Sequence, residues 1–285
     1  MNNVIIILNY NDYDNCKEIL ERIRNYDVLS HIVVVDNNST DDSYTRLKEF
    51  ENSRISVIKS DKNGGYAYGN NFGVLYTIKH IKDVDNIIIS NPDVIFSEET
   101  VLEMEKAFYA DEQVAVVGSV VHSLDGKIDP CFAWNRFDYD FIIRPYLRIY
   151  SALATRLSKK RLLYSIDRLY EKTFFDVGTV HGCFFMIKLN DFIKVGLFDE
   201  RTFLYCEEDI LSYRLMKIGK RECVATNSSI VHKGSGTINK NIKERKTVNR
   251  FSYESRLLYL TEYLNVSKFQ LSIYKMLVKI RGLSN

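Results

Sequence analysis

The sequence predicts an α/β protein built on a mostly parallel, Rossmann-like sheet flanked by helices. Short runs of β-branched residues alternate with helical patterns through the first part of the chain, as they do in βα units. Three of the predicted strands also end in polar loops rich in Asn, Asp or Gly. Ligands of such sheets bind beyond the carboxyl ends of the strands, so these loops are the first place to look for a site.

The first half of the chain supplies the sheet. Its apolar runs are too short for helices and carry the β-branched residues that buried strands favour. Between these runs, apolar residues recur with helical spacing. We therefore expect strands at 4–8, 32–35, 55–58, 86–90 and 114–118, and helices at 14–25, 41–51, 66–80 and 98–109.

The second half changes in character. Between residues 138 and 172, aromatic, leucine and basic residues replace the alternation, and we interpret this stretch as a helical insertion. Its basic surface suits either solvent or anionic lipid. The remaining expected elements are a strand-like stretch at 174–187 around His181 and Gly182, a helix from Glu207 to Gly219, a short strand at 229–231 and a helical remainder.

Charge, cysteine content and apolar runs exclude several classes of protein. The 285 residues carry a formal net charge of +2, so no overall field draws the chain to nucleic acid. The five cysteines form no Cys-x-x-Cys pair, which indicates a reducing compartment and no structural zinc. We see no signal peptide and no apolar run of about 18 residues, so we expect a cytoplasmic protein, or one peripheral on the inner face of the cytoplasmic membrane.

Two strand ends carry a carboxylate. Asp36 directly follows its strand, and Asp93 closes the turn Asn91-Pro92-Asp93 after another. Carboxylates in this position can hold metals or polar ligands, although Asn-Pro-Asp is also ordinary turn chemistry. Asp41, further along the first of these loops, serves equally well as a helix cap. We favour the ligand role for Asp36 and Asp93.

A third strand end leads into a loop rich in glycine and asparagine. Such a loop lets the backbone approach a ligand closely, and the helix behind it presents N–H groups that suit a phosphate. The glycine spacing matches neither the dinucleotide fingerprint nor a P-loop, which argues against a nicotinamide enzyme and a P-loop NTPase. The residues concerned are Asn63, Gly64, Gly65, Gly69, Asn70, Asn71 and Gly73.

Two further features indicate catalysis. His232 follows a short strand and precedes a glycine-rich loop, and with Asp93 it offers one nitrogen and one oxygen ligand for Mn²⁺ or Mg²⁺. Glu207, Glu208 and Asp209 stand together at the start of a helix. Their charges suit the helix dipole, but crowding also raises at least one pKa, as a general base near neutral pH requires.

In their order and spacing, these motifs resemble those of the family 2 glycosyltransferases, and more narrowly the bacterial rhamnosyltransferase-like branch. The similarity runs from Val4 to about Ser235. It rests on Asn9-Tyr10-Asn11, Val35-Asp36-Asn37-Asn38-Ser39, 63–71, Asn91-Pro92-Asp93, 196–200, 207–214 and His232. The resemblance implies a glycosyltransferase A-type fold, a nucleoside diphosphate sugar as donor, a divalent metal, and inversion at the anomeric carbon.

The resemblance also implies roles for individual residues. Glu208 matches the position of the catalytic base, with Asp209 as its rival and Glu207 beside them. Asp93 matches the last acid of the family's Asp-x-Asp metal motif, and Asn91 replaces the first acid, which leaves one charge fewer for the metal. The acceptor-binding positions would be His181 and Gly182, and the donor-binding positions would be Asn9, Tyr10, Asn11, Asp36, Asn38, Asn63, Gly64, Gly65, Gly69, Asn70, Asn91 and Asp93.

On this basis we expect a glycosyltransferase domain at 1–245 and a C-terminal helical region at 246–285. The domain would divide into a nucleotide-sugar-binding half, 1–125, and an acceptor and catalytic half, 126–245, with the insertion at 138–172. The implied reaction moves a sugar such as rhamnose from a dTDP- or UDP-linked donor to a growing lipid-linked surface polysaccharide. The alternative is a non-catalytic nucleotide-sugar-binding or assembly module of the same fold.

The end of the chain predicts an amphipathic helix. Lys268, Ser272, Lys275 and Lys279 form one polar stripe, and apolar residues cover most of the remaining surface. Such a helix must bury its apolar residues, either against the domain or on a bilayer. Both interpretations stay open, and the second predicts peripheral contact with a membrane.

Overall fold

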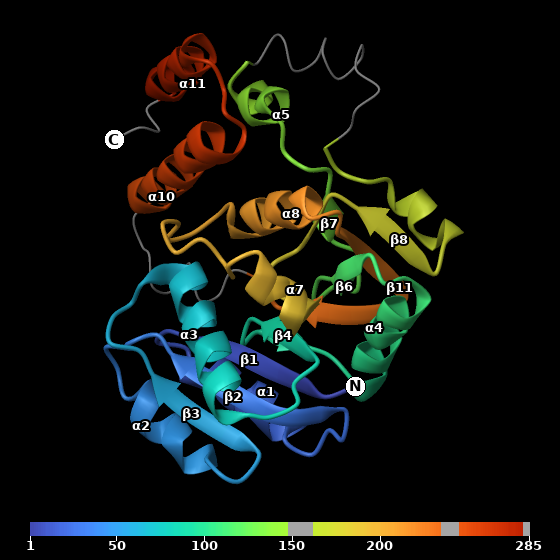
Figure 1. Cartoon of the computed structure of the whole chain (residues 1–285). Helices are drawn as coiled ribbons and strands as arrows, with labels where there is room; N and C mark the ends of the chain where they lie inside the picture. Colours follow the sequence, from blue (N-terminus) through green and yellow to red (C-terminus); the bar gives the residue numbers. More distant parts are fainter. Residues whose placement is uncertain (148–161, 235–244, 282–285) are drawn as a thin grey trace.

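A mixed nine-stranded sheet forms the centre of the computed structural model, which describes residues 1–147, 162–234 and 245–281 (Figure 1). Its strand order is β3-β2-β1-β4-β10-β6-β11-β5, and β8 pairs with β11 outside this path. The strands are β1 (Asn3–Asn9), β2 (Leu29–Asp36), β3 (Ile55–Lys59), β4 (Asn86–Ser90), β5 (Val94–Ile95), β6 (Val114–His122), β8 (Phe174–Val177), β10 (Phe184–Lys188) and β11 (Arg221–His232). A separate two-stranded ribbon contains β7 (Ala133–Trp134) and β9 (Thr179–Val180).

The predicted alternation of strands and helices is confirmed in the first half. β1 runs parallel to both β2 and β4, and β2 runs parallel to β3. β1 and β4 are buried along almost their whole length, which explains why they consist of unbroken apolar runs. The helices between the strands are α1 (Tyr13–Ile23), α2 (Ser43–Leu47) with a 3₁₀ turn at Lys48–Phe50, α3 (Gly65–His80) and α4 (Glu98–Ala110).

The stretch around His181 differs from the prediction. Instead of one strand through His181 and Gly182, the chain forms β8, β9 and β10, with a turn over residues 181–183 before β10. β10 then runs antiparallel to both β4 and β6. The expectation of a strand at these two residues was therefore wrong. The turn brings the Gly182 backbone against Glu208, a tertiary contact that the local sequence pattern does not show.

The predicted insertion at 138–172 is described in part, and residues 148–161 lie outside the described residues. Its first element is α5 (Tyr139–Ile143), which begins where the Asp138 side chain accepts a hydrogen bond from the Phe141 N–H at 2.9 Å. Short 3₁₀ helices follow at Arg144–Tyr146 and Ile166–Glu171. The described ends of the insertion are therefore helical, in agreement with the prediction.

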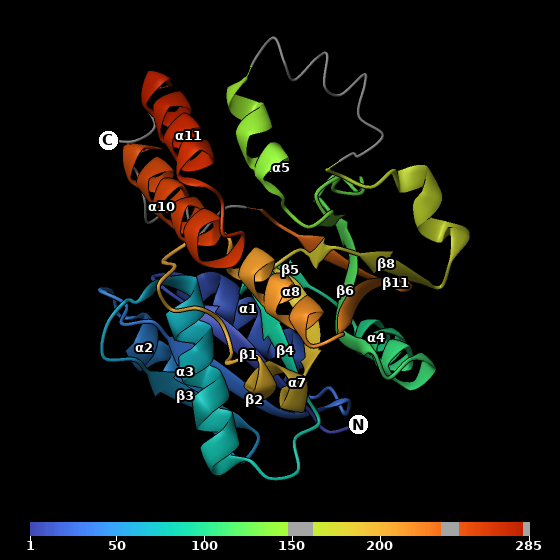
Figure 2. The same ribbon diagram turned by 45° about the horizontal axis from the view of Figure 1, so that its top comes forward.

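The C-terminal helices pack on the domain around a second apolar core (Figure 2). α8 begins at Glu207 and ends before Gly219, as predicted, and Gly219 takes the left-handed φ of +75° that favours glycine at a helix end. The other helices of this half are α7 (Leu189–Lys194), α10 (Arg245–Leu258), a π-helical turn at Tyr259–Tyr263 and α11 (Lys268–Ile280). The buried members of the second core are Ile142, Ile210, Tyr259, Leu260, Tyr263, Tyr274 and Val278.

No helix in the described part of the chain is both long enough and apolar enough to cross a membrane. α11 instead contributes Tyr274 and Val278 to the second core. Its opposite side carries Phe269, Met276 and Ile280, which are exposed. Packing on the domain thus accounts for one face of the predicted amphipathic helix and leaves another face apolar and uncovered among the described residues.

An ionic network around the buried Asp199 ties the second core to the loop before α8. Asp199 accepts hydrogen bonds from Arg201 Nη2 at 2.7 Å and from Tyr263, and it pairs with Arg214 at 3.3 Å. Burial alone would raise the pKa of Asp199, but the hydrogen bonds from Arg201 and Tyr263 lower it to about 2. The network therefore fixes the π-helical turn against the element that carries the three acids.

Candidate active site

Buried hydrogen bonds lock together the loops after β1 and β2. Asn9 Nδ2 donates to Asp36 Oδ2 at 2.8 Å, and the Ser39 N–H donates to Asp36 Oδ1 at 2.9 Å. Asn9 and Asp36 are fully buried, so these bonds satisfy polar groups that cannot reach solvent. Asp36 thus shapes the loop from beneath. The predicted donor-binding residues that stay partly exposed here are Tyr10, Asn11 and Asn38.

The glycines of the third loop allow close packing. A side chain at Gly65, where φ is +87°, would overlap with the Phe203 carbonyl, and one at Gly69 would overlap with β1. At the start of α3, the Gly65 N–H already donates to Asn63 Oδ1 at 3.2 Å, and the next N–H donates to the Phe203 carbonyl at 2.9 Å. These two donors are therefore occupied by the protein. A donor-binding role stays a prediction for Asn63, Gly64, Gly65, Gly69 and Asn70.

Asp93 and His232, which are far apart in the sequence, meet at one end of the sheet. β5 pairs with the last residues of β11, so that Val94 lies opposite His232. Asp93 Oδ1 is 3.4 Å from His232 Nε2, and both side chains are largely buried. Close by, the Asn91 N–H donates to the Cys183 carbonyl at 2.8 Å. A carboxylate oxygen and an imidazole nitrogen that face each other are a ligand pair suited to Mn²⁺ or Mg²⁺.

The three acids at the start of α8 have different surroundings. Glu207 is 2% exposed, its Oε1 has no hydrogen-bond partner among the described residues, and burial raises its pKa well above the usual range. Asp209 is also 2% exposed and accepts a hydrogen bond from Trp134 Nε1 at 2.8 Å, while burial raises its pKa to about 7. Glu208 is partly exposed, and burial raises its pKa as well. Of the three acids, Glu208 is therefore the only one that is partly exposed.

The turn at residues 181–183 lies against the Asp93–His232 pair. The His181 ring is edge-on to the His232 ring, with centroids 5.6 Å apart, and the Cys183 sulfur lies within 4.8 Å of both histidines. The Cys183 N–H donates to His181 Nδ1 at 3.0 Å. Burial and the neighbouring His232 lower the pKa of His181 to about 4. His181 is therefore neutral near pH 7, with its proton on Nε2.

The middle of the same turn contacts the candidate base. The Glu208 carboxylate occupies the space that a side chain on Gly182 would need. Tyr66 Oη donates to the Gly182 carbonyl at 2.6 Å and holds this part of the turn in place. Glu208, the candidate base, and His232, a candidate metal ligand, therefore both lie against the same short turn of backbone.

Sequence reasoning missed three residues of this cluster: Tyr66, Trp134 and Cys183. An aromatic residue inside a helix and a lone cysteine in an apolar run are ordinary core residues, so nothing marks Tyr66 or Cys183. Trp134 is the only tryptophan in the chain and lies in a polar-flanked segment, which is a usable signal.

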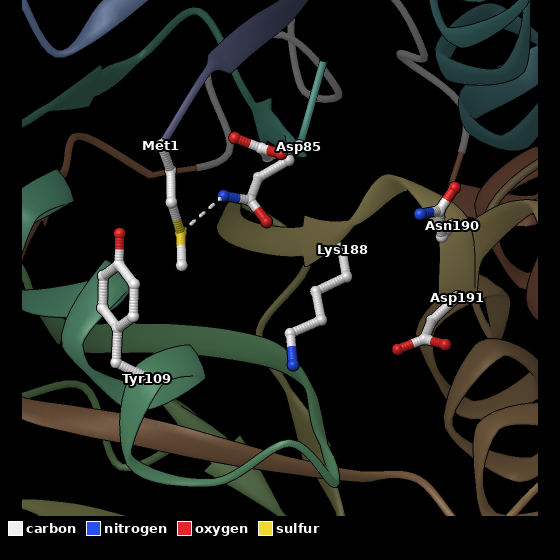
Figure 3. Close-up of a pocket in the computed structure, with 7 residues that line it drawn as sticks. Met1, Asp85, Tyr109, Lys188, Asn190 and Asp191 are labelled. Atoms are coloured by element: carbon white, nitrogen blue, oxygen red, sulfur yellow. Dashed lines mark hydrogen bonds between the residues drawn. The ribbon is translucent and has the colours of Figure 1, made fainter. Parts of the chain in front are cut away.

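A separate hollow of about 620 Å³ lies at the other edge of the sheet (Figure 3). Met1, Asn86 and Lys188 line it, where β1 and β4 begin and β10 ends. The carboxyl ends of β1 and β4 lie at the opposite edge, next to the cluster described above. None of the residues predicted for the site lines this hollow.

Sequence comparison relates the chain to enzymes of glycan synthesis. Rhamnosyltransferase WbbL of Escherichia coli K12 is 27% identical over 227 residues, which cover 76% of this chain and 78% of that protein. A low-salt glycan biosynthesis hexosyltransferase of Haloferax volcanii is 24% identical over 214 residues, which cover 74% of this chain and 60% of the relative. An N-acetylglucosaminyl-diphospho-decaprenol L-rhamnosyltransferase of Mycobacterium tuberculosis is 23% identical, and the match covers 70% of this chain and 66% of the relative. The chain thus spans less than two thirds of two of these relatives.

Structural comparison confirms the glycosyltransferase A-type fold. A crystal structure of GalNAc-T7 with UDP, GalNAc and Mn²⁺ superposes with a TM-score of 0.60 and 14% identity, and covers 99% of this chain and 54% of that one. The mannosyltransferase PcManGT from Pyrobaculum calidifontis, in complex with GDP-Man and Mn²⁺, gives a TM-score of 0.55 and 15% identity, and covers 99% and 75% of the two chains. At this level of identity the likeness concerns the fold.

The family assignment comes from the sequence itself. The model of glycosyl transferase family 2 matches residues 4–196, which include the loops after β1 to β4, the turn at 181–183 and most of the sheet. This match spans more than half of the chain. The protein therefore belongs to glycosyl transferase family 2.

Proposed function

We propose that the protein is an inverting glycosyltransferase that moves a sugar from a nucleoside diphosphate to a saccharide acceptor carried on a lipid. Family membership supports the reaction class, and the geometry of one turn supports the roles proposed for Glu208 and His232. At this turn, Gly182 contacts the partly exposed Glu208, and His181 contacts the ring of His232. The proposed proton acceptor and the proposed cation-binding pair therefore lie next to the same short turn, and we propose that the donor sugar binds between them.

In the proposed reaction, Glu208 takes the proton from an acceptor hydroxyl as that oxygen attacks the anomeric carbon. The bond from this carbon to the diphosphate oxygen breaks on the opposite face, so the anomeric configuration inverts. One carboxylate suffices, whereas most glycoside hydrolases need two. The raised pKa of Glu208 makes it a stronger base than an ordinary glutamate.

Asp93 and His232 would hold the divalent ion, and its charge would stabilise the negative charge on the departing diphosphate. The pair fits a hard cation because its oxygen and nitrogen lie 3.4 Å apart and are largely shielded from water. Asn91 stands where a second acid is usual in the family, so the site has one negative charge fewer. We propose Mn²⁺ or Mg²⁺ as the ion, bound more weakly than at a site with two acids.

For the donor we propose a dTDP- or UDP-linked sugar, with rhamnose as the first candidate. Two of the relatives are rhamnosyltransferases by name, and one of those names includes a diphospho-decaprenol acceptor. Partly exposed Tyr10, Asn11 and Asn38 at the rim of the first two loops are the groups proposed to contact the nucleoside. Asp36 would support them from below through its bonds to Asn9 and the Ser39 N–H.

The proposal is tested by incubating the purified protein with dTDP-rhamnose and a panel of UDP-sugars in Mn²⁺, Mg²⁺ or EDTA. We expect metal-stimulated release of the nucleoside diphosphate with at least one donor. A non-catalytic module of the same fold would bind a nucleotide sugar without releasing the diphosphate. Binding without turnover, with every donor and an acceptor panel present, would therefore favour that alternative.

Asp93→Ala is expected to weaken nucleoside diphosphate binding about tenfold or more in Mn²⁺ and to change it little in EDTA, because its proposed role works through the cation. Isothermal titration calorimetry with dTDP and UDP measures both conditions. Asp125→Ala, at an exposed acid in the turn after β6, is the control and should match the wild type. Equal losses of affinity with and without Mn²⁺ would reject metal ligation by Asp93.

Peripheral contact with a membrane is supported by the outer face of α11. Phe269, Met276 and Ile280 are 75%, 54% and 71% exposed, and their spacing puts them on one line along the helix. Each directly follows a lysine in the sequence, so a row of positive charge runs beside the apolar line. The opposite face is anchored by Tyr274 and Val278. An exposed apolar line beside lysines fits the surface of an anionic bilayer.

Replacing Phe269 and Ile280 together by Ser should abolish co-sedimentation with phosphatidylglycerol vesicles and leave the melting temperature unchanged, since both side chains are exposed. Wild-type binding should fall with salt, because each nearby lysine contributes about 1 kcal/mol on anionic lipid. Leu124→Ser, at a 68% exposed leucine after β6, serves as control. Unchanged sedimentation of the double variant would reject the contact. Deleting residues 266–285 is less informative, because it removes Tyr274 from the second core.

A further inference from the structure

Several contacts hold the Trp134 side chain in place beside the three acids at the start of α8. Its Nε1–H donates to Asp209 Oδ1 at 2.8 Å. Its ring lies edge-on to the His181 ring, with centroids 6.2 Å apart, and nearly parallel to the Phe137 ring at 6.4 Å. Its backbone pairs with Thr179 in the β7–β9 ribbon, two residues before His181. The orientation of the indole is therefore set before any ligand binds.

The indole is held rigidly but is only partly covered. Trp134 and Phe137 are both partly exposed, whereas the preceding Phe132 is fully buried in the core. The one polar group of the indole is already used by Asp209, so what remains for a ligand is flat apolar surface with a negative π-face. Such a surface suits one face of a sugar ring, where C–H bonds point outward while the hydroxyls lie around the edge. Rigid aromatic residues also bind at low cost in conformational entropy.

The position of Trp134 favours the acceptor over the donor. Asp209, which holds the indole, is the neighbour of Glu208 in the first turn of α8, and a base must lie within reach of the acceptor hydroxyl. The loops proposed to hold the nucleoside follow β1 and β2, which are separated from β6 and β11 by β4 and β10. In Figure 1, β7 and α8 lie next to each other and away from β2 and β3.

We propose that Trp134, with Phe137 beside it, is the platform on which the terminal sugar of the acceptor stacks while Glu208 takes the proton from its hydroxyl. This inference rests on the proposed function and assigns its acceptor subsite. The ligand class is a pyranoside presented by its C–H face. Asp209 then acts as a positioning residue, because its carboxylate sets the angle of the indole.

Variants at Trp134 separate stacking from structural support. Trp134→Leu removes the aromatic face, and we expect the acceptor KM to rise about tenfold or more while the donor KM stays within about twofold. Trp134→Phe keeps a flat ring but loses the bond to Asp209, and its acceptor KM should lie between those of the wild type and Trp134→Leu. Tyr109→Leu, at an exposed aromatic by the remote hollow, is the control and should leave both constants unchanged.

Fluorescence provides a test that does not depend on a variant folding, because Trp134 is the only tryptophan in the chain. The wild-type protein is titrated with octyl glycosides of N-acetylglucosamine, rhamnose, glucose and galactose, and with octanol as the sugar-free control. A glycoside that serves as acceptor should change the tryptophan emission in a saturable manner, with half-saturation near its KM. Octanol should not.

The outcomes distinguish this inference from the proposed function. If the protein releases nucleoside diphosphate and an octyl glycoside accepts the sugar without changing the emission, or if Trp134→Leu keeps a normal acceptor KM, the platform is rejected. Trp134→Phe and Trp134→Leu could also raise the acceptor KM by the same factor, and the donor KM as much as the acceptor KM. That result would mean that Trp134 only supports the structure. Absence of turnover with every nucleotide sugar would overturn the proposed function, and the emission titration would still report whether Trp134 binds a glycoside.

Discussion

Glu208→Gln is expected to abolish sugar transfer while leaving the affinity for the donor within a few-fold of the wild-type value. The amide keeps the shape of the carboxylate, so the contact with Gly182 survives, but it cannot take a proton from the acceptor. Loss of a general base costs about 10² to 10⁴ in rate. The rate constant is measured in single turnovers at saturating donor, and donor affinity is measured by calorimetry.

Asp209→Asn is the matched control for this variant. Its Oδ1 can still accept the hydrogen bond from Trp134 Nε1, so we expect the indole to stay in place and transfer to fall only modestly. The opposite ranking, with near-normal turnover in Glu208→Gln and none in Asp209→Asn, would make Asp209 the base.

Gly182→Ala is expected to reduce transfer nearly as much as loss of the base, while the melting temperature changes little. The backbone at Gly182 lies outside the left-handed region, so alanine is not strained there. The added methyl group would overlap with Glu208 Oε1, the mobile end of a side chain, so the carboxylate must move rather than the fold. A base displaced by about 1 Å can lose about 10²-fold in rate.

A double variant shows whether this effect passes through Glu208. In the Glu208→Gln background, Gly182→Ala should cause little further loss of transfer, because the two changes remove the same function. A second loss of full size in the double variant would mean that Gly182 acts independently of Glu208, for example through the acceptor.

The sheet could be predicted because its strands are buried on both faces. β1 and β4 therefore appear in the sequence as apolar runs. In the helices between the parallel strands, apolar residues recur with helical spacing. Asp93 and His232, the residues proposed as metal ligands, could also be picked out from the sequence. Their distance could not be predicted, since it depends on the two-residue strand β5, which pairs with the end of β11 and is too short to leave a pattern.

Other parts of the site follow from tertiary contacts that no local pattern encodes. The turn at 181–183 lies close to Glu208, which is distant in sequence, and the ranking of the three acids depends on which of them the fold covers. The sequence also suggests that Asp36 faces a ligand, whereas the fold turns both its oxygens toward Asn9 and the Ser39 N–H. Burial of this kind is decided by packing between distant segments.

The pH dependence of kcat tests most directly whether Glu208 is the base of this site. A base must be deprotonated to act, so transfer falls as the pH decreases through its pKa. Burial raises the pKa of Glu208 above the ordinary value of 4.5, so we expect the acidic limb of the wild-type profile to lie above pH 4.5. Asp209→Asn should keep this limb, and the residual activity of Glu208→Gln should lack it. A limb that persists unchanged in Glu208→Gln would contradict the assignment.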